Sequence, residues 1–203
     1  MKGRLVVFEG IDGAGTETQS KKLCQHLLDN GMPAVRLEYP DYSGPIGHLI
    51  HEFLHGKYEL SEETLFLLHV TDKIKDRDRI NRLLDEGKTV VCDRYYTAIL
   101  GYQCSHGIPL KKALDLAEMF DVPKPDVIFY LSIRPETSLM RKGAEKGGRD
   151  SLDRNEADME KQQRLVEYYD KLVRDQVWSS WYAINGEKPI EEVFGQVMKV
   201  LNI

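Results

Sequence analysis

Short β-branched runs alternate with longer helical stretches along this 203-residue chain, and this alternation limits the possible folds more than any other feature. The apolar runs predict strands at residues 4–8, 34–38, 89–93, 126–132 and 181–184. Helices are expected at residues 18–30, 46–56, 61–86, 135–146, 155–175 and 189–201. Strand–helix alternation predicts an α/β fold, a parallel sheet with helices on both faces. We expect a single domain over residues 1–203.

The composition argues against several classes of function. With 41% hydrophobic residues, 30% charged residues and a net charge of −5, the chain lacks the basic surface that nucleic acids or anionic membranes require. No apolar stretch approaches the ~20 residues of a membrane span. The first apolar run stops at Glu9, so we expect no signal peptide. Cys24, Cys92 and Cys104 form no CxxC pair, and we interpret them as buried thiols of a cytoplasmic protein.

The segment FEGIDGAGTETQS, residues 8–20, follows the first strand and has the spacing of a phosphate-binding loop. In the motif GxxxxGK[ST], backbone N–H groups surround phosphate oxygens, the lysine neutralises charge and the hydroxyl holds magnesium. Here Thr16 and Glu17 stand where the lysine and the serine or threonine are expected. The motif alone leaves two interpretations open, a nucleotide site that relies on its backbone or a tight strand–helix turn without a ligand. The glycines of this backbone are Gly10, Gly13 and Gly15.

Three further segments, DRYY…GYQ, PKPDVIFYL and DRNE…Y, follow in order. Together with FEGIDGAG…TQ they resemble the thymidylate kinase family of P-loop nucleoside monophosphate kinases over essentially the full length. The resemblance implies a P-loop kinase fold with a five-stranded parallel sheet, and a lid at about residues 141–156. It implies transfer of the γ-phosphoryl group of ATP to dTMP with Mg²⁺, giving dTDP and ADP. It also implies a homodimer, with the helix from Ser61 as its interface.

The resemblance also implies a set of site residues. The catalytic residues would be Asp12, Asp93, Arg94 and, in the lid, Arg149 and Arg154. The ATP-binding residues would be Gly10, Ile11, Asp12, Gly13, Ala14, Gly15, Thr16, Glu17, Thr18 and Arg141. The acceptor-binding residues would be Asp12, Tyr39, Pro40, Tyr42, His69, Lys73, Arg94, Tyr102 and Gln103. The magnesium ligands would be Glu17 and Asp93.

Arg94 has a chemical reason to hold the acceptor phosphate. A guanidinium binds phosphate oxygens through two parallel hydrogen bonds and stays protonated. It lies at the end of a strand, where α/β sheets bind ligands. Taken alone, Asp93 and Arg94 are equally consistent with a surface ion pair at a strand end.

Several residues depart from the family pattern. His69 stands where the family has a phenylalanine stacked on thymine, and Lys73 replaces an arginine that contacts the base. Ala98 and Ile99 follow Thr97 where a serine and its neighbour are expected, and Asp41 stands where many members have arginine. These changes affect the acceptor preference more than the reaction class. A sister kinase for another deoxynucleoside monophosphate and a catalytically silent nucleotide-binding protein therefore remain alternatives.

The missing lysine raises two questions about charge. The lid arginines are the first candidates for a replacement cation, followed by Lys146 and Arg141. Glu17 would lie near the triphosphate, where a bare carboxylate is repelled. It either holds the metal through its oxygen atoms or turns away to pair with Lys21, four residues along the helix.

The segment HEFLH, residues 51–55, matches the zinc peptidase pattern H-E-x-x-H. His48 adds a third imidazole nearby, but Gly56 ends the helix at once and no later segment offers an obvious third ligand. The alternative is an amphipathic helix whose apolar residues pack while its histidines meet solvent.

Overall fold

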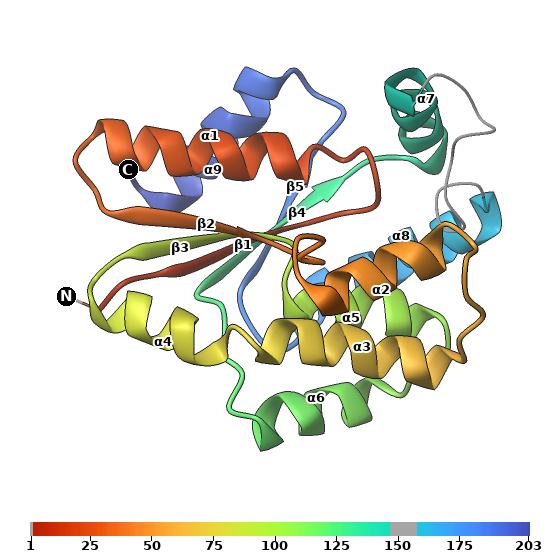
Figure 1. Cartoon of the computed structure of the whole chain (residues 1–203). Helices are drawn as coiled ribbons and strands as arrows, with labels where there is room; N and C mark the ends of the chain where they lie inside the picture. Colours follow the sequence, from red (N-terminus) through yellow and green to blue (C-terminus); the bar gives the residue numbers. More distant parts are fainter. Residues whose placement is uncertain (1, 147–157) are drawn as a thin grey trace.

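The computed structural model of the chain describes residues 2–146 and 158–203, and a five-stranded parallel sheet forms its centre (Figure 1). The strand order is β2-β3-β1-β4-β5. The strands are β1 (Leu5–Glu9), β2 (Ala34–Glu38), β3 (Thr89–Asp93), β4 (Val127–Ser132) and β5 (Trp181–Asn185). Each predicted strand is present with its ends shifted by at most one residue, and the α/β prediction is confirmed.

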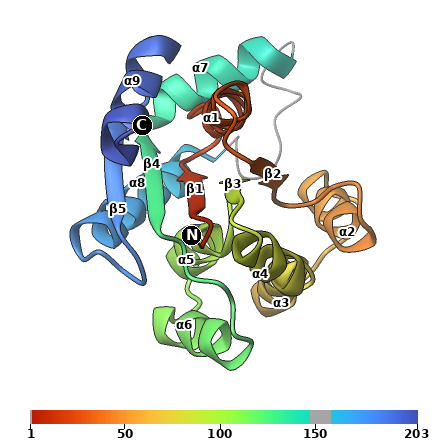
Figure 2. The same ribbon diagram turned by 90° about the vertical axis from the view of Figure 1, so that its left-hand side faces the viewer.

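Helices cover both faces of this sheet (Figure 2). One face is covered by α1 (Thr16–Asp29) and α9 (Ile190–Leu201). The opposite face is covered by α4 (Arg77–Asp85), α5 (Tyr96–Ser105) and α8 (Met159–Arg174). The remaining helices are α2 (Pro45–Leu54), α3 (Glu62–Ile74), α6 (Leu110–Met119) and α7 (Pro135–Lys146). Of the helices in the described ranges, none is long and apolar enough to cross a membrane.

The central strand β1 carries the sequence LVVFE, and all five residues are buried. Such a run suits a parallel strand that has helices on both sides. Phe8 lies in register with Asp93 of β3, and Glu9 with Tyr130 of β4. The carboxyl ends of the three middle strands therefore meet at one edge, which is where ligands bind to open α/β sheets.

The continuous helix predicted over residues 61–86 is wrong, because α3 ends at Ile74 and α4 starts at Arg77. At the break, the ammonium group of Lys75 contacts Asp72 at 3.3 Å and Asp76 at 2.6 Å. Asp76 also accepts a hydrogen bond of 3.1 Å from the Tyr39 hydroxyl. The contact from Tyr39 fastens the break to the loop after β2. It is a tertiary contact, so the helical periodicity of the sequence does not reveal it.

Helices α5 and α6 were not predicted. Eight of the ten residues of α5 are buried, so its sequence has no polar face to reveal a helical period. Helix α6 is short, but it buries Ala113 and Ala117 at the i, i+4 spacing of a helix face, a signal that was present and missed.

Candidate active site

The phosphate-binding loop, residues 10–17, connects β1 to the first turn of α1. Gly13 and Gly15 have φ angles of 75° and 93°, in the left-handed region that other residues rarely adopt. Gly15 is the N-cap of α1, so the free N–H groups of the helix and its dipole face outward at this point. The backbone half of the motif is therefore built, and it suits an anion.

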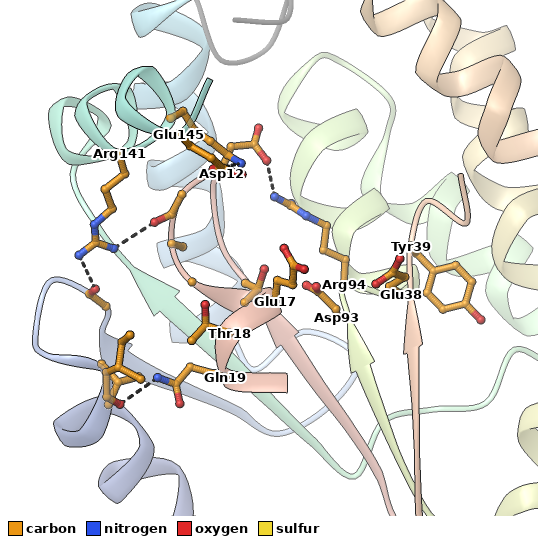
Figure 3. Close-up of a pocket in the computed structure, with 18 of the residues that line it drawn as sticks. Asp12, Glu17, Thr18, Gln19, Glu38, Tyr39, Asp93, Arg94, Arg141 and Glu145 are labelled. Carbon is orange, nitrogen blue, oxygen red and sulfur yellow. Dashed lines mark hydrogen bonds and ion pairs between the residues drawn. The ribbon is translucent and has the colours of Figure 1, made fainter. Parts of the chain in front are cut away.

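A cavity of about 1080 Å³ opens at this loop (Figure 3). Its walls come from the phosphate-binding loop, the ends of β2 and β3, the loop after β2, helices α2 and α7, and the segment that leads into α9. Eight of the ten predicted ATP-binding residues line it, while Gly10 and Ile11 are buried. The eight are Asp12, Gly13, Ala14, Gly15, Thr16, Glu17, Thr18 and Arg141.

Arg94 lines this cavity directly after β3 and points toward Asp12 (Figure 3). Its Nη2 is 2.5 Å from the Asp12 carboxylate, and its Nη1 donates to the Gly10 carbonyl and the Tyr102 hydroxyl, both at 3.0 Å. The φ angle of Arg94 is 59°, an uncommon value for a residue with a side chain. Three of its five N–H groups are held by these contacts, which leaves two for a ligand.

Asp93, the last residue of β3, is held from two sides. Arg36 of β2 donates to its Oδ2 at 2.7 Å, and the Thr16 hydroxyl donates to the same carboxylate. Arg36 also donates to Ser20 of α1 at 2.9 Å and to Glu38 at 2.6 Å. Burial raises the pKa of Asp93, while Arg94, Thr16 and Arg36 lower it. Position 16 thus supplies a hydroxyl to Asp93, and β2 supplies a cation beside it.

A smaller hollow of about 80 Å³ adjoins the cavity and shares six lining residues with it, among them Asp12 and Arg94. All nine predicted acceptor residues line this hollow, together with Leu54 and Ala98. They come from the phosphate-binding loop, the loop after β2, helix α3, the turn after β3 and helix α5. Segments far apart in the sequence therefore converge on one small space.

His69 and Lys73 form the α3 side of the hollow. The Lys73 ammonium is 3.3 Å from His69 Nδ1 and 3.3 Å from Asp72 Oδ2. Burial lowers the pKa of Lys73 to about 8, and Asp72 partly offsets this effect. Burial, with Lys73 and Arg94 nearby, holds the pKa of His69 well below its usual range. At neutral pH, the hollow therefore presents a neutral imidazole next to an ammonium group.

The geometry agrees with comparisons to known proteins. A model of the family described as thymidylate kinase matches residues 8–197. A thymidylate kinase of Dictyostelium discoideum is 32% identical over 203 residues, covering 99% of this chain and 86% of the relative. The human thymidylate kinase is 30% identical over 194 residues, covering 95% and 86%. A probable thymidylate kinase of Methanococcus aeolicus is 32% identical over 202 residues, covering 98% and 95%.

The chain belongs to the thymidylate kinase family. The residues of the acceptor region that depart from the family pattern have different surroundings. Asp41 contacts Lys75 at 3.2 Å and accepts a 2.6 Å hydrogen bond from Ser43, so it anchors its own loop. Of the pair Ala98 and Ile99, only Ala98 lines the hollow, since Ile99 is fully buried in the core.

Glu17 is predicted to be a metal ligand, but its carboxylate forms an ion pair of 2.5 Å with the Lys21 ammonium. More than half of the Glu17 side chain is exposed, and the hydrogen bond from Lys21 lowers its pKa. The geometry is that of the alternative interpretation, in which the carboxylate turns along the helix. Its role as a metal ligand stays a prediction.

Of the cationic residues predicted in the lid region, the structure describes the side chain of Arg141. Arg141 on α7 donates to the carbonyls of Gly13 at 3.0 Å and Gly186 at 3.1 Å, which joins α7 to the phosphate-binding loop. Arg149, Arg154 and the side chain of Lys146 lie outside the described residues. The expectation that they act on the transferring phosphoryl group stays open.

The polar groups of the HEFLH segment contact one another or a neighbouring lysine. The rings of His51 and His55 stack at 4.0 Å, and Glu52 pairs with Lys57 at 2.5 Å. Within residues 2–146 and 158–203, no group of three or more His, Cys, Asp and Glu side chains is arranged to hold a metal ion. Both histidines line the larger cavity, so they belong to its wall.

Two charged residues near the site were missed in the sequence. Arg36 interrupts the apolar pattern of its strand, and Glu9 ends a strand whose five residues are all buried. A charge within an apolar run was the available signal, because a charge that becomes buried requires a partner. The sequence does not show which partner each one has.

Proposed function

We propose that this member of the thymidylate kinase family is an ATP-dependent kinase that transfers the γ-phosphoryl group of ATP to dTMP, giving dTDP and ADP. The observation that supports this most strongly is the convergence of all nine expected acceptor residues on one hollow. That hollow adjoins the cavity of the phosphate-binding loop, and Arg94 lines both. Two nucleotides bound on either side of Arg94 would have their phosphates facing each other.

The protein acts mainly by positioning and by supplying positive charge, which is what phosphoryl transfer demands. The backbone N–H groups of residues 13–17 bind the phosphates of ATP. Arg94 uses its two remaining N–H groups for the phosphate of dTMP, while Asp12 and Tyr102 hold its side chain in place. His69 stacks on the base, and Lys73 donates to a carbonyl of the base.

Mg²⁺ fits the residues beside the phosphate-binding loop. Magnesium prefers hard oxygen ligands and commonly uses one or two carboxylates with the phosphates of the substrate. Asp93 and the Thr16 hydroxyl are such oxygen donors, and they already contact each other. When bound, Mg²⁺ would neutralise phosphate charge. We further propose that Arg149 and Arg154 supply the cation that position 16 lacks.

The function is tested by coupled ADP release with a panel of deoxynucleoside monophosphates, and ATP without an acceptor as control. We expect dTMP to be the best acceptor. If another monophosphate is the best acceptor, that nucleotide takes the place of dTMP in the proposal, and the proposed reaction class is kept. ATP binding without turnover of any acceptor would overturn the kinase proposal and leave a silent nucleotide-binding protein.

We also propose a cytoplasmic homodimer with α3 at its interface. Leu67 of α3 is 53% exposed, an apolar side chain that a partner copy would cover. Light scattering after size exclusion should give a dimer for the wild type, and Leu67→Glu should shift it toward monomer. Met140→Glu is the matched control, because Met140 is 67% exposed but lies on α7. Equal behaviour of both variants would contradict this interface.

A further inference from the structure

Glu9 is a charged residue at the end of the central strand, with 0% exposure. A buried carboxylate is destabilising unless hydrogen bonds satisfy its oxygen atoms. Oε1 accepts from the Tyr95 backbone N–H at 3.1 Å and from the Thr97 hydroxyl at 2.6 Å, and Oε2 accepts from the Tyr169 hydroxyl at 3.0 Å. One carboxylate thus ties β1 to the start of α5 and to the middle of α8.

The contact to Tyr95 fastens the turn that carries Arg94. Asp93 ends β3 and α5 starts at Tyr96, so the chain turns within two residues. Arg94 has a left-handed φ angle of 59°, a conformation that persists in such a residue when its surroundings hold it. The backbone N–H groups of Arg94 and Tyr95 both bind β1. The N–H of Arg94 donates to the Phe8 carbonyl at 2.9 Å, and the N–H of Tyr95 donates to the Glu9 carboxylate.

The contact to Tyr169 reaches the Arg94 side chain by a second route. The ring of Tyr169 meets the ring of Tyr102 edge-on at 6.3 Å, and the Tyr102 hydroxyl accepts from Arg94 Nη1 at 3.0 Å. Gly101 makes room for this arrangement, since a Cβ there would lie 2.5 Å from Cζ of Tyr169. Tyr169 is itself fully buried. The turn and the guanidinium are therefore both supported from Glu9.

We propose that Glu9, together with Tyr169, is a positioning residue that keeps the guanidinium of Arg94 aimed at the acceptor phosphate. Neither residue lines the cavity or the hollow, so both act through Arg94. The inference rests on the proposed function, in which Arg94 binds the phosphate of dTMP. It goes beyond that function by assigning a role to two buried side chains outside the site.

The ionised form of Glu9 is the one that can accept all three hydrogen bonds. Burial raises the pKa of Glu9 to about 7, while Arg94 and the three donors lower it. Protonation would turn one acceptor oxygen into a donor and weaken the hold on the turn. The titratable groups that face Glu9 come from β3, its following turn, β4, α3, α5 and α8, and they are Cys92, Arg94, Tyr130, Lys73, Tyr102 and Tyr169.

The test compares Glu9→Gln and Tyr169→Phe with Tyr96→Phe. The control removes a similar buried hydroxyl, because Tyr96 donates to the Ala113 carbonyl at 2.8 Å, away from the site. Unfolding in urea first shows that each variant is folded. We then measure kcat/KM for dTMP, KM for ATP, and dTMP binding by calorimetry, which does not depend on turnover.

Positioning predicts that both test variants lower kcat/KM for dTMP by about tenfold or more, the effect of losing a hydrogen bond to a charged group. The KM for ATP should stay within about twofold, and Tyr96→Phe should keep wild-type values. In the pH profile of kcat/KM for dTMP, the wild type should lose activity below about pH 7 as Glu9 protonates. Glu9→Gln should keep only the ionisation of the substrate phosphate, near pH 6.

The outcomes separate the inference from the function on which it rests. A wild type that neither binds nor phosphorylates dTMP would overturn the proposed function and the inference with it. An active wild type whose test variants match Tyr96→Phe would overturn the inference alone. If Glu9→Gln does not fold, Tyr169→Phe decides, since unchanged dTMP binding and kinetics in that variant would refute the positioning role.

Discussion

Glu9→Gln is expected to remove a pH dependence of stability that the buried carboxyl group imposes on the folded protein. Burial raises the pKa of Glu9 from 4.5 to about 7. Each unit of difference between folded and unfolded states corresponds to ~1.4 kcal/mol, so the full effect on the free energy of unfolding is roughly 3 kcal/mol. Because the folded-state pKa is raised, this stabilisation is complete below about pH 4.5 and is lost as the pH rises through about 7.

The glutamine variant removes that dependence and adds a constant loss. Its amide presents N–H groups to a site built of donors, which lowers the free energy of unfolding by roughly 1–3 kcal/mol at every pH. The difference in stability between variant and wild type should therefore move in favour of the variant, by roughly 3 kcal/mol in total, as the pH rises from about 4.5 to 8.

The assay is urea unfolding at several pH values between about 5 and 8, followed by the fluorescence of the two tryptophans, Trp178 and Trp181, of which Trp181 is 3% exposed. Glu17→Gln serves as a control whose difference from the wild type should stay nearly constant between about pH 5 and 8. The hydrogen bond from Lys21 lowers the pKa of Glu17 from 4.5, so its contribution is complete above about pH 4.5 and fades only as the pH falls further. Because Glu17 and Lys21 are mostly exposed, that effect should be small. A difference between Glu9→Gln and wild type that stays constant over this range would refute the reasoning.

Four further predictions concern the site. Arg94→Ala should lower kcat/KM for dTMP by ~2–4 kcal/mol, expressed as a transition-state free energy, and leave ATP affinity nearly unchanged; near-normal kcat/KM in steady-state assays would contradict the phosphate role. His69→Phe should hold or improve dTMP binding in calorimetry and His69→Ala should weaken it, because base stacking contributes ~1–3 kcal/mol; stronger binding by the alanine variant would exclude stacking. Glu17→Gln should leave the Mg²⁺ concentration for half-maximal activity unchanged, since Glu17 pairs with Lys21; a clear rise in a Mg²⁺ titration would make Glu17 a metal ligand. Arg36→Met should lower the free energy of unfolding by roughly 1–3 kcal/mol, because Asp93 loses a 2.7 Å ion pair in a mostly buried place; a change below about 0.5 kcal/mol in urea unfolding would show that the pair is not stabilising.

The strands and the phosphate-binding loop could be predicted because their signals are local. β-branched apolar runs favour buried strands, and the glycine spacing permits the left-handed angles found at Gly13 and Gly15. The DR pair also lies at the strand end where its position in the sequence suggested. The resemblance to a family then indicated which side chains converge on the acceptor hollow, although their roles stay predictions.

The partners of the charged side chains were decided only by the tertiary structure. Arg36 and Asp93 are 57 residues apart, and Glu9 and Tyr169 are 160 residues apart, so no local pattern connects them. The break between α3 and α4 likewise depends on Asp76 meeting Tyr39 from another loop. Hydrophobic periodicity records which face of an element is buried, whereas an ion pair or a buried hydrogen bond depends on which elements the fold brings together. For that reason the sequence reveals that the phosphate-binding loop lacks its lysine, whereas only the tertiary structure reveals that Thr16 and Arg36 both contact Asp93.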